Sequence, residues 1–573
     1  MKRSVIKRTF DILASSAATG LLSPVLFAVG AAVKLDSPGP VFFKQKRIGK
    51  DKKTFSMYKF RTMRTDTPHD MPTHLLKDPG AYITKVGAFL RKTSLDELPQ
   101  LFNILRGDMS VVGPRPALWN QDDLIADRDR YGANAVRPGL TGWAQVNGRD
   151  ELEIPVKAAF DGEYLHRQSL LFDLWCIFRT AVNTVFHSGV VEGGTGIHSD
   201  TKKKLLLATN HSYMLYRFRK ELIETLQDEY DVVVTTPLVG SEAQLEAMGC
   251  RLIPTEIDRR SLNPVKDLHL ALFYLKTLFA ERPDTVLTYS IKPNIYMNLL
   301  CRILGVPYYA NVQGLGTAFQ NKYLALFVSL LYKLALGDAR KVFFENEENA
   351  NLFIENKTIE AYRIKVLHGA GINLQTFRFS DDLPDEPIRF LYLGRIMREK
   401  GIDELLNAYQ RVKDLYADHV TLEVVGFYED DYRERLETLA ADGTIELTGF
   451  TEDPIPCYER ASCVVLPSYH EGLSNVLLEA AATGRPLIAS DIPGCREAVE
   501  PDVSGYLCRK KDADALFEAM HRYCDLSHDE RLAMGIAGRR RMEQLFDKTD
   551  VVNETLAAMR EGCPFRKFDD EIA

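Results

Sequence analysis

The sequence predicts an α/β protein in which a small N-terminal domain precedes two larger lobes, each built around a parallel sheet. An apolar segment interrupted by Ser23-Pro24 opens the chain, and compact polar motifs follow it. Beyond residue 203, short β-rich runs alternate with helical stretches, which is typical of a parallel sheet covered by helices. The same alternation restarts after residue 380 and predicts a second lobe of the same kind.

Length and composition agree with several ordinary globular domains. The 573 residues are too many for one core, and 45% of them are hydrophobic and 26% charged. A net charge of -7 does not favour nucleic-acid binding. The nine cysteines include no CxxC pair and predict reduced, buried thiols instead of disulfides or a metal site. The sequence leaves a homo-oligomer open.

The apolar segment at residues 12–33 has Lys and Arg clusters on both flanks. A cleaved signal peptide and a kinked spanning helix are two alternatives. Both basic flanks prefer the cytoplasmic face, however, and could lie on an anionic membrane surface. The break at Ser23-Pro24 leaves halves of about 11 residues, each roughly half a bilayer core long. We therefore expect a re-entrant membrane hairpin over about residues 10–34, entering and leaving on one face.

Two adjacent carboxylates, Asp96 and Glu97, lie between Arg91 and the turn GPRP that carries Arg115. Guanidinium groups bind phosphate oxygens in a bidentate manner. A carboxylate can also attack phosphorus and form an acyl phosphate. This arrangement therefore suggests phosphate chemistry.

A purely structural alternative is a helix capping box formed by Ser94 and Glu97. It would place Pro99 at the fifth helical position, where its ring and its missing N–H are costly. If Asp96 is the cap, Pro99 falls in the first turn, where the N–H has no helical partner. We therefore expect Asp96 at or next to a helix N-terminus, which favours an ionised carboxylate.

An ordered set of motifs identifies a family resemblance over roughly residues 1–200. The set comprises DSPGPVFFKQKRIG at 36–49, YKFRTM at 58–63, TSLDELPQ at 93–100, NILRGDMSVVGPRP at 103–116 and RPGLTGWAQVNGR at 137–149. Together they resemble the monotopic phosphoglycosyl transferases, the PglC-like initiating sugar transferases of bacteria. The resemblance implies transfer of a sugar-1-phosphate from a UDP-sugar to undecaprenyl phosphate, with release of UMP.

The resemblance also implies roles for individual residues. Asp96 would be the nucleophile that forms a phospho-sugar intermediate, and Glu97, with Asp96, would hold Mg²⁺. Arg91 and Arg115 would bind phosphate. Arg137 would join them by its place in the RPG segment, for which a plain turn is the alternative.

For Lys59 and Arg61 the alternative to a functional role is a solvated face. Ser23-Pro24 matches the membrane-helix break of the family. The segment 164–186 is apolar but contains Asp173 and Arg179, so it is a poor span. An interfacial helix and ordinary core packing both fit it.

The second half begins after a Gly-rich stretch that predicts a linker over 191–203. We expect strands within 204–209, 231–236, 285–289 and 341–344 in a first lobe, 204–380. A second lobe, 381–573, would contain strands within 389–394, 421–426, 463–467 and 486–490 and then C-terminal helices. Both lobes would be Rossmann-like, joined near residues 380–387, with ligands at the carboxyl ends of the strands. No GxGxxG fingerprint follows the first strand, which argues against an NAD enzyme.

Two motifs of the second lobe follow predicted strands. GRIMREKG at 394–401 places Arg395 and Lys400 at a strand-to-helix turn, a natural diphosphate site, although a plain surface turn is the alternative. In HEGLSNVLLE at 470–479, Glu471 and Glu479 are eight residues apart and would share one face of a helix. Two acids on one face are usually solvated, but the leucines between them suggest a buried helix, and buried acids need partners.

These motifs resemble those of retaining glycosyltransferases of family 4, which have the GT-B fold. TYSIKPNIY at 288–296 and NVQGLGT at 311–317 narrow the resemblance to PglA-like and capsule-type enzymes, over roughly residues 203–560. It implies that Arg395 and Lys400 bind the donor diphosphate, Glu471 the donor sugar and Glu479 the ribose hydroxyls. Gly314 and Gly316 would shape a first-lobe loop facing the cleft. No metal is expected in this part, and His211 is expected in the core or at the surface.

The two resemblances together predict a bifunctional enzyme at the cytoplasmic face of the bacterial inner membrane. The first domain would load a sugar-phosphate onto undecaprenyl phosphate, and the GT-B unit would add a second sugar. A different class of function is also open, in which the GT-B unit is a catalytically silent binding module.

Overall fold

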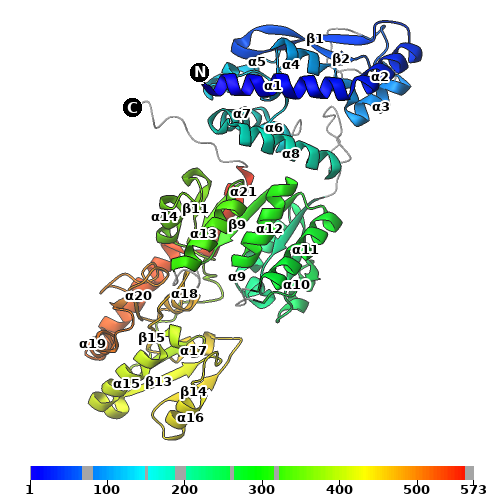
Figure 1. The fold of residues 1–573 in the computed structure, drawn as a ribbon. Coiled ribbons are helices and arrows are strands. Elements are labelled where there is room, and N and C mark those ends of the chain that lie inside the picture. The colour runs from blue at the N-terminus through cyan, green and yellow to red at the C-terminus, as the bar shows by residue number, and fades with distance from the viewer. Residues whose placement is uncertain are drawn as a thin grey trace. The chain divides into compact units, whose positions relative to one another are not determined.

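The computed structural model describes residues 2–67, 82–148, 152–186, 202–258, 263–314 and 322–561. It divides the chain into two compact units, one formed by the elements up to residue 186 and one by those from residue 203 onward (Figure 1). Most of the predicted linker at 191–203 lies outside the described residues, and Gly316 lies outside them entirely.

The first unit combines helices with two small sheets. Its elements are α1 (Lys2–Leu21), α2 (Ser23–Asp36), β1 (Phe42–Ile48), the 3₁₀ turn η1 (Lys50–Lys52), β2 (Thr54–Phe60), α3 (Lys85–Thr93), the 3₁₀ turn η4 (Leu95–Glu97), α4 (Gln100–Arg106), β3 (Ser110–Val112), α5 (Asp122–Arg130), η5 (Ala133–Ala135), β4 (Gly139–Thr141), α6 (Trp143–Val146), α7 (Ile154–Arg167) and α8 (Leu170–Phe186). β1 and β2 form an antiparallel hairpin, and β3 pairs with β4 in parallel.

The apolar N-terminal segment forms two helices that meet at Leu22 with a bend of 63°. Pro24 lies in the first turn of α2, where the missing N–H costs no helical hydrogen bond. In the described part of the chain no single helix is long and apolar enough to span a bilayer, whereas this bent pair passes by length and composition. The predicted break is therefore present, and a re-entrant insertion stays a proposal.

The polar side of α1 faces its own unit. Arg8 donates to the carbonyls of Ile104 and Leu105 at 2.6 and 2.8 Å, at the end of α4. Asp11, which is 1% exposed, accepts from Ser110 Oγ at 2.9 Å. Lys7 forms a 2.7 Å ion pair with Asp173 of α8. Two of the basic residues expected at a membrane surface, Lys7 and Arg8, thus make contacts within the unit.

Helix α8 has two different faces. Phe172, Asp173 and Arg179 are buried, whereas Leu171 and Phe178 are exposed. One side of α8 therefore packs in the core and the other exposes apolar side chains. The buried charges of the core side, Asp173 and Arg179, have partners inside the unit.

The second unit contains two parallel sheets. The first lobe contains β5 (Lys203–Ala208), α9 (Ser212–Leu226), β6 (Tyr230–Thr236), α10 (Glu242–Ala247), β7 (Arg251–Pro254), α11 (Pro264–Glu281), β8 (Thr285–Tyr289), α12 (Ile291–Leu304), β9 (Tyr308–Val312), α13 (Lys322–Leu336), β10 (Val342–Phe344), α14 (Glu347–Glu355) and β11 (Ile364–Val366). The sheet order is β11-β10-β9-β8-β5-β6-β7, and every pairing is parallel.

The second lobe is a six-stranded parallel sheet in the order β14-β13-β12-β15-β16-β17. Its elements are β12 (Ile388–Leu393), α15 (Ile402–Tyr416), β13 (Val420–Val425), α16 (Arg433–Ala441), β14 (Glu446–Gly449), α17 (Ile455–Glu459), β15 (Cys463–Leu466), α18 (Asn475–Ala482), β16 (Leu487–Ser490), β17 (Gly505–Cys508), α19 (Ala513–Cys524) and α20 (His528–Leu545). The eight predicted strands are present within a residue or two of their expected bounds. Five further strands, β7, β9, β11, β14 and β17, were not predicted.

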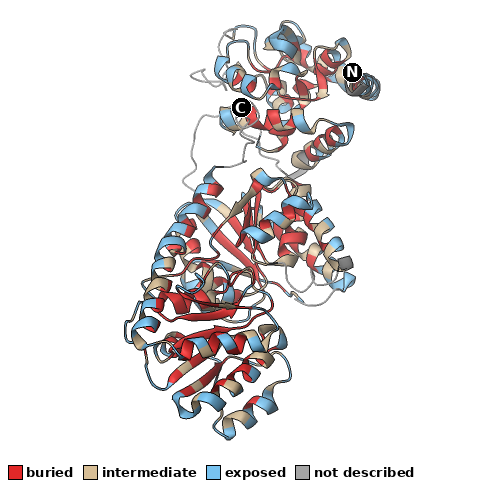
Figure 2. Ribbon diagram, turned by 90° about the vertical axis from the view of Figure 1, so that its left-hand side faces the viewer, coloured by how far each residue is buried: buried red, intermediate tan, exposed pale blue. Residues whose placement is uncertain are grey.

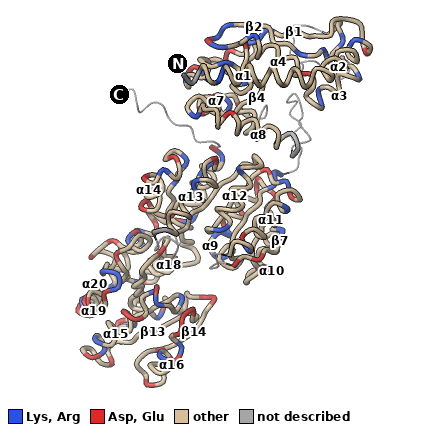
Figure 3. Tube along the Cα trace, viewed as in Figure 1, with Lys and Arg blue, Asp and Glu red and all other residues tan. Residues whose placement is uncertain are grey.

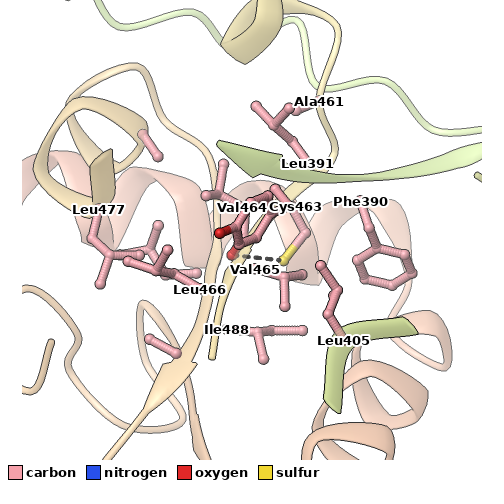
Figure 4. Packing of buried hydrophobic residues seen from close by; sticks show 14 of the residues in the cluster. Phe390, Leu391, Leu405, Ala461, Cys463, Val464, Val465, Leu466, Leu477 and Ile488 are labelled. Atoms are coloured by element: carbon pink, nitrogen blue, oxygen red, sulfur yellow. Dashed lines mark hydrogen bonds between the residues drawn. The ribbon is translucent and has the colours of Figure 1, made fainter. Parts of the chain in front are cut away.

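Central strands of this unit are buried on both faces, as the red strands of Figure 2 show. Figure 4 shows the core around β15, in which Cys463, Val464 and Val465 belong to one buried cluster with Phe390 and Leu405. The eight cysteines within the described residues are all buried and free, in agreement with the predicted reduced thiols. Because β15 is fixed in this core, the loop that follows it has a rigid base.

The last helix, α21 (Lys548–Arg560), follows the second lobe in sequence but packs on the first. Its Val551 and Leu556 join the first-lobe core, and Tyr309 of β9 donates to the carbonyl of Met559 at 2.8 Å. The chain therefore crosses between the lobes twice, which ties them together.

Candidate functional site

The first candidate site surrounds the 3₁₀ turn η4. Asp96 and Glu97 lie in this turn and are only 4% and 9% exposed. Asp96 is not the cap of α4, because Pro99 holds that position, and Ser94 ends α3 in a left-handed conformation instead of forming a capping box. Both capping interpretations were therefore wrong in detail, although Asp96 does lie next to a helix N-terminus.

Lys59 of β2 lies between the two carboxylates. Its Nζ is 2.8 Å from Glu97 Oε1 and 3.5 Å from Asp96 Oδ2. Arg115 also approaches Glu97, with Nη2 at 3.4 Å from Oε1. The solvated-face interpretation of Lys59 was wrong, because its side chain is only 16% exposed. A lysine beside two buried acids lowers the cost of keeping them charged.

The turn that carries Arg115 is held rigidly. Gly113 donates to the carbonyl of Thr141 at 2.8 Å, and the buried Arg128 donates to the carbonyl of Arg115 at 2.9 Å. A Cβ on Gly113 would lie 2.4 Å from the carbonyl oxygen of Arg137, so only glycine fits. The RPG segment thus supports this turn through its backbone.

The other predicted phosphate ligands have different partners. Arg91 Nε donates to Thr62 Oγ1 at 3.0 Å, and Arg137 Nε donates to the carbonyl of Gly107 at 2.9 Å. Arg61 is buried and donates to three carbonyls of residues 37–40, so its solvated-face alternative was also wrong. Among the described residues the structure therefore groups Asp96, Glu97, Lys59 and Arg115, and the phosphate roles of Arg91 and Arg137 stay predictions.

The acids of this turn suit a divalent cation only in part. Mg²⁺ in phosphate-transfer sites usually takes one or two carboxylates and completes its shell with water and substrate phosphates. Asp96 and Glu97 supply such a pair. No group of three or more acidic, histidine or cysteine ligands occurs in the described ranges. The donor set therefore fits a magnesium ion only if water and phosphate oxygens complete its shell.

The second candidate site is a hollow where the two lobes of the second unit meet. Its cavity volume is about 2790 Å³, and Gly314, Arg395, Lys400 and Glu471 line it. Lys400 Nζ is paired with Glu471 Oε1, and Arg395 Nη1 lies 2.6 Å from Glu429 Oε2. Three predicted ligands of a nucleotide sugar are thus grouped at the carboxyl ends of β12 and β15.

Glycines allow the lobes to touch next to Glu471. A Cβ on Gly472 would lie 1.8 Å from the carbonyl oxygen of Gln313, and one on Gly314 would lie 3.5 Å from the Gly472 Cα. Asn346 Nδ2 donates to the carbonyl of Gly472 at 2.8 Å. The first-lobe loop at Gly314 therefore faces the turn after Glu471.

Glu471 and Glu479 do not share a helix, which corrects the sequence interpretation. Helix α18 begins at Asn475, capped by Ser474, so Glu471 lies in the loop before it. Glu479 is 3% exposed and does not line the hollow. A local spacing of eight could not reveal this, because the helix starts only after the turn at Gly472.

Arg217 of α9 reaches Glu479 from the opposite lobe. Its Nη2 lies 3.2 Å from Glu479 Oε1, and Tyr458 Oη donates to Oε2 at 2.7 Å. Burial raises the pKa of Glu479, and Arg217 opposes that rise. Sequence analysis did not identify Arg217, which lies 262 residues from Glu479 along the chain. His211, in contrast, caps α9 by accepting from the Met214 amide at 3.4 Å.

An acid that the sequence did not predict also lines the hollow. Glu345, directly after β10, lines the hollow and accepts from the buried Arg219 at 2.8 Å. Burial raises the pKa of Glu345 to about 7, although Arg219 opposes the rise. A carboxyl group that titrates near neutral pH can hold or release a proton in the cleft.

Comparisons with known proteins address the two units separately. Residues 2–187 match the family model of the bacterial sugar transferases, residues 204–346 that of glycosyl transferase 4-like proteins, and residues 387–525 that of glycosyl transferases group 1. The first unit is 42% identical over 190 residues to the UDP-glucose:undecaprenyl-phosphate glucose-1-phosphate transferase of Escherichia coli K12. That match covers 31% of this chain and 39% of the relative, so the chain spans about two fifths of that protein.

A second relative is covered more completely. The exopolysaccharide production protein ExoY of Rhizobium meliloti is 42% identical over 193 residues, which are 30% of this chain and 83% of ExoY. Solved structures resemble the second unit. Anabaena HepE in complex with UDP has a TM-score of 0.52 at 16% identity over 62% of this chain and 100% of HepE.

The sucrose-phosphate synthase of Thermosynechococcus elongatus has a TM-score of 0.52 at 21% identity over 63% of this chain and 99% of that one. At such identities the likeness concerns the fold, two parallel-sheet lobes of glycosyltransferase type.

Proposed function

Because the chain belongs to the bacterial sugar transferase family through its first unit and carries glycosyltransferase domains in its second, we propose two successive reactions. The first unit transfers a sugar-1-phosphate from a UDP-sugar to undecaprenyl phosphate. The second unit then adds a sugar from a nucleotide sugar to that lipid, with retention of configuration. The observation that carries the proposal is the buried pair Asp96 and Glu97, held between Lys59 and Arg115.

In the first reaction Asp96 acts as the nucleophile. One of its carboxylate oxygens attacks the phosphorus that bears the sugar, a new O–P bond forms, and the bond to UMP breaks. The lipid phosphate oxygen then attacks the same phosphorus and releases the carboxylate. Arg115 and Lys59 offset the negative charge of the diphosphate, which would otherwise repel the attacking carboxylate.

A magnesium ion held by Asp96 and Glu97 would supply further charge neutralisation for the phosphates. Arg91 and Arg137 are proposed as additional phosphate ligands, by motif position alone. The acceptor lipid places this chemistry at the cytoplasmic face of the bacterial inner membrane, with the bent pair α1–α2 as the membrane-inserted hairpin.

In the second reaction the hollow between the lobes receives the nucleotide sugar. Arg395 and Lys400 would bind its diphosphate, Glu471 its sugar and Glu479 its ribose. The grouping of three of these around one hollow supports this assignment. No metal is proposed here, and Arg395 and Lys400 would provide the positive charge for the diphosphate.

The test uses purified full-length protein, undecaprenyl phosphate and a panel of UDP-sugars, with lipid products weighed by mass spectrometry. We expect products carrying one and two sugars. Asp96→Asn should abolish the first product yet still extend a supplied undecaprenyl-diphospho-sugar, and Glu479→Ala should stop at the first product. Asp122→Asn, an exposed acid on α5, is the matched control.

If Asp96→Asn still transferred sugar-1-phosphate to undecaprenyl phosphate, Asp96 could not be the nucleophile. A wild-type protein that never adds the second sugar, and that binds the lipid product nevertheless, would favour the alternative in which the GT-B unit is only a binding module.

A further inference from the structure

Helix α13 of the first lobe exposes an unusually apolar face. Leu326, Leu330 and Leu334 recur every four residues and are 73%, 54% and 46% exposed. Between Leu324 and Leu336 the only charged residue is Lys333, and Figure 3 shows few charges along this helix. Such a stripe is normally buried against a partner in a globular protein.

Helix α11 presents a second stripe. Val265, Leu268 and Leu272 follow helical spacing and are each more than half exposed. Contiguous exposed apolar patches are uncommon on soluble proteins and mark interaction sites.

The two stripes reach the same hollow that contains the predicted transfer site. The lining of this hollow includes exposed apolar side chains from both helices: Leu268 of α11, and Leu326, Phe327 and Leu330 of α13. Arg395 and Lys400 line the same hollow from the second lobe. One continuous cavity therefore joins charged side chains of the second lobe to exposed apolar side chains of the first.

The size of the hollow also exceeds the needs of one substrate. Sites for small molecules usually measure roughly 300–1,000 Å³. The hollow of about 2790 Å³ has room for a nucleotide sugar and for part of a second, larger ligand. A nucleotide sugar is polar along its whole length and gives no reason for exposed leucines.

We propose that the exposed faces of α11 and α13 bind the hydrocarbon chain of the lipid-linked acceptor, next to its diphosphate and sugar. This rests on the proposed second reaction. The acceptor has a charged head and a long polyprenyl chain, so its chemistry matches a cavity that has charged side chains in one part and exposed apolar side chains in another. Removing leucine and isoprene surface from water together supplies the binding free energy.

The test compares two acceptors that carry the same diphospho-sugar, one on an undecaprenyl chain and one on a two-isoprene geranyl chain. The double variant Leu326→Ser/Leu330→Ser should raise the KM for the undecaprenyl acceptor about tenfold or more. The kcat, the KM for the UDP-sugar and the KM for the geranyl acceptor should stay unchanged. Leu415→Ser, an equally exposed leucine on α15, is the matched control and should change nothing.

A second readout needs no turnover. An undecaprenyl-diphospho-sugar with a photoreactive diazirine on the first isoprene units of its chain should label peptides of residues 264–272 and 324–334 in the full-length wild type, and the double variant should lose this labelling. Equal losses with both acceptors, or unchanged KM values with labelling elsewhere, would overturn the proposal.

Two further outcomes would assign the stripes to another occupant. Loss of vesicle binding with unchanged KM in detergent would indicate bilayer docking, and loss of a dimer in solution would indicate a second copy of the chain. Wild-type protein that labels these peptides but transfers no sugar would contradict the second reaction while supporting the chain site.

Discussion

At the scale of single residues, Lys59 is the cation that the two adjacent carboxylates of a buried turn share. It contacts both Asp96 and Glu97, and its own side chain is only 16% exposed. Adjacent acids repel each other, so a shared cation lowers the cost of charging both.

We predict that Lys59→Gln slows the first reaction at least tenfold and destabilises the first unit by roughly 3–5 kcal/mol, because the two buried acids lose the cation that they share. Initial rates of UMP release and urea unfolding would measure the two effects. Lys59→Arg should restore most of both, and Lys53→Gln, a change at an exposed lysine just before β2, should affect neither. Wild-type rates in Lys59→Gln would show that the acids do not depend on this cation.

In the second unit Arg217 is the cation beside a buried acid, Glu479. Burial raises the pKa of Glu479 above that of a free glutamate, and Arg217 is the charged side chain closest to it. Tyr458 donates a hydrogen bond, and Lys548 contributes a weaker favourable charge.

We predict that Arg217→Gln raises the pKa of Glu479 further, so that less of the carboxylate is ionised at a given pH. Because we propose that ionised Glu479 accepts hydrogen bonds from ribose hydroxyls, UDP affinity should weaken as pH falls, more steeply than in the wild type. Calorimetric titration with UDP at several pH values would measure it, with Arg217→Lys as the conservative variant. A pH dependence identical to the wild type would contradict the coupling.

At the scale of elements, α1 is both an apolar helix and an anchored one. Its outer residues Ile12 and Leu13 are exposed, while Asp11 is buried against β3. Asp11 Oδ1 accepts from Ser110 Oγ and from the Val111 amide at 2.9 and 3.0 Å. The start of the bent pair is therefore attached to the unit that contains η4, which limits how far α1 can insert into a bilayer.

We predict that Asp11→Ala destabilises the first unit by about 2–4 kcal/mol, since it leaves one buried and one half-buried donor without this acceptor. Urea unfolding monitored by tryptophan fluorescence would measure this. Thr9→Ala, a change on the exposed side of α1, should cost far less. Equal stabilities of the two variants would mean that the contact with β3 contributes little.

At the scale of the whole molecule, one chain carries two units whose proposed reactions share a lipid. Covalent linkage raises the concentration of the first product near the second unit. The linkage is useful only if the lipid reaches the second hollow before it diffuses away.

We predict that cutting the chain between the units lowers the share of doubly glycosylated lipid at early times. A specific protease site inserted within residues 191–200 of the full-length protein would allow the comparison before and after cleavage. Mass spectrometry of the lipids would follow both products, with an uncut protease-treated wild type as the control. Equal release of the one-sugar lipid before and after cleavage would argue against any advantage of fusion.

The sequence by itself determined the alternation of strands and helices, the break at Ser23-Pro24 and the motifs that contain Asp96, Lys400 and Glu471. These features are local, because strand pattern, proline geometry and motif spacing act over a few residues. Only the tertiary structure placed Lys59 between the two acids, Arg217 on Glu479 and α21 on the first lobe. Those contacts join residues that are from about 40 to more than 260 positions apart, and no local periodicity encodes which distant side chain completes a buried charge.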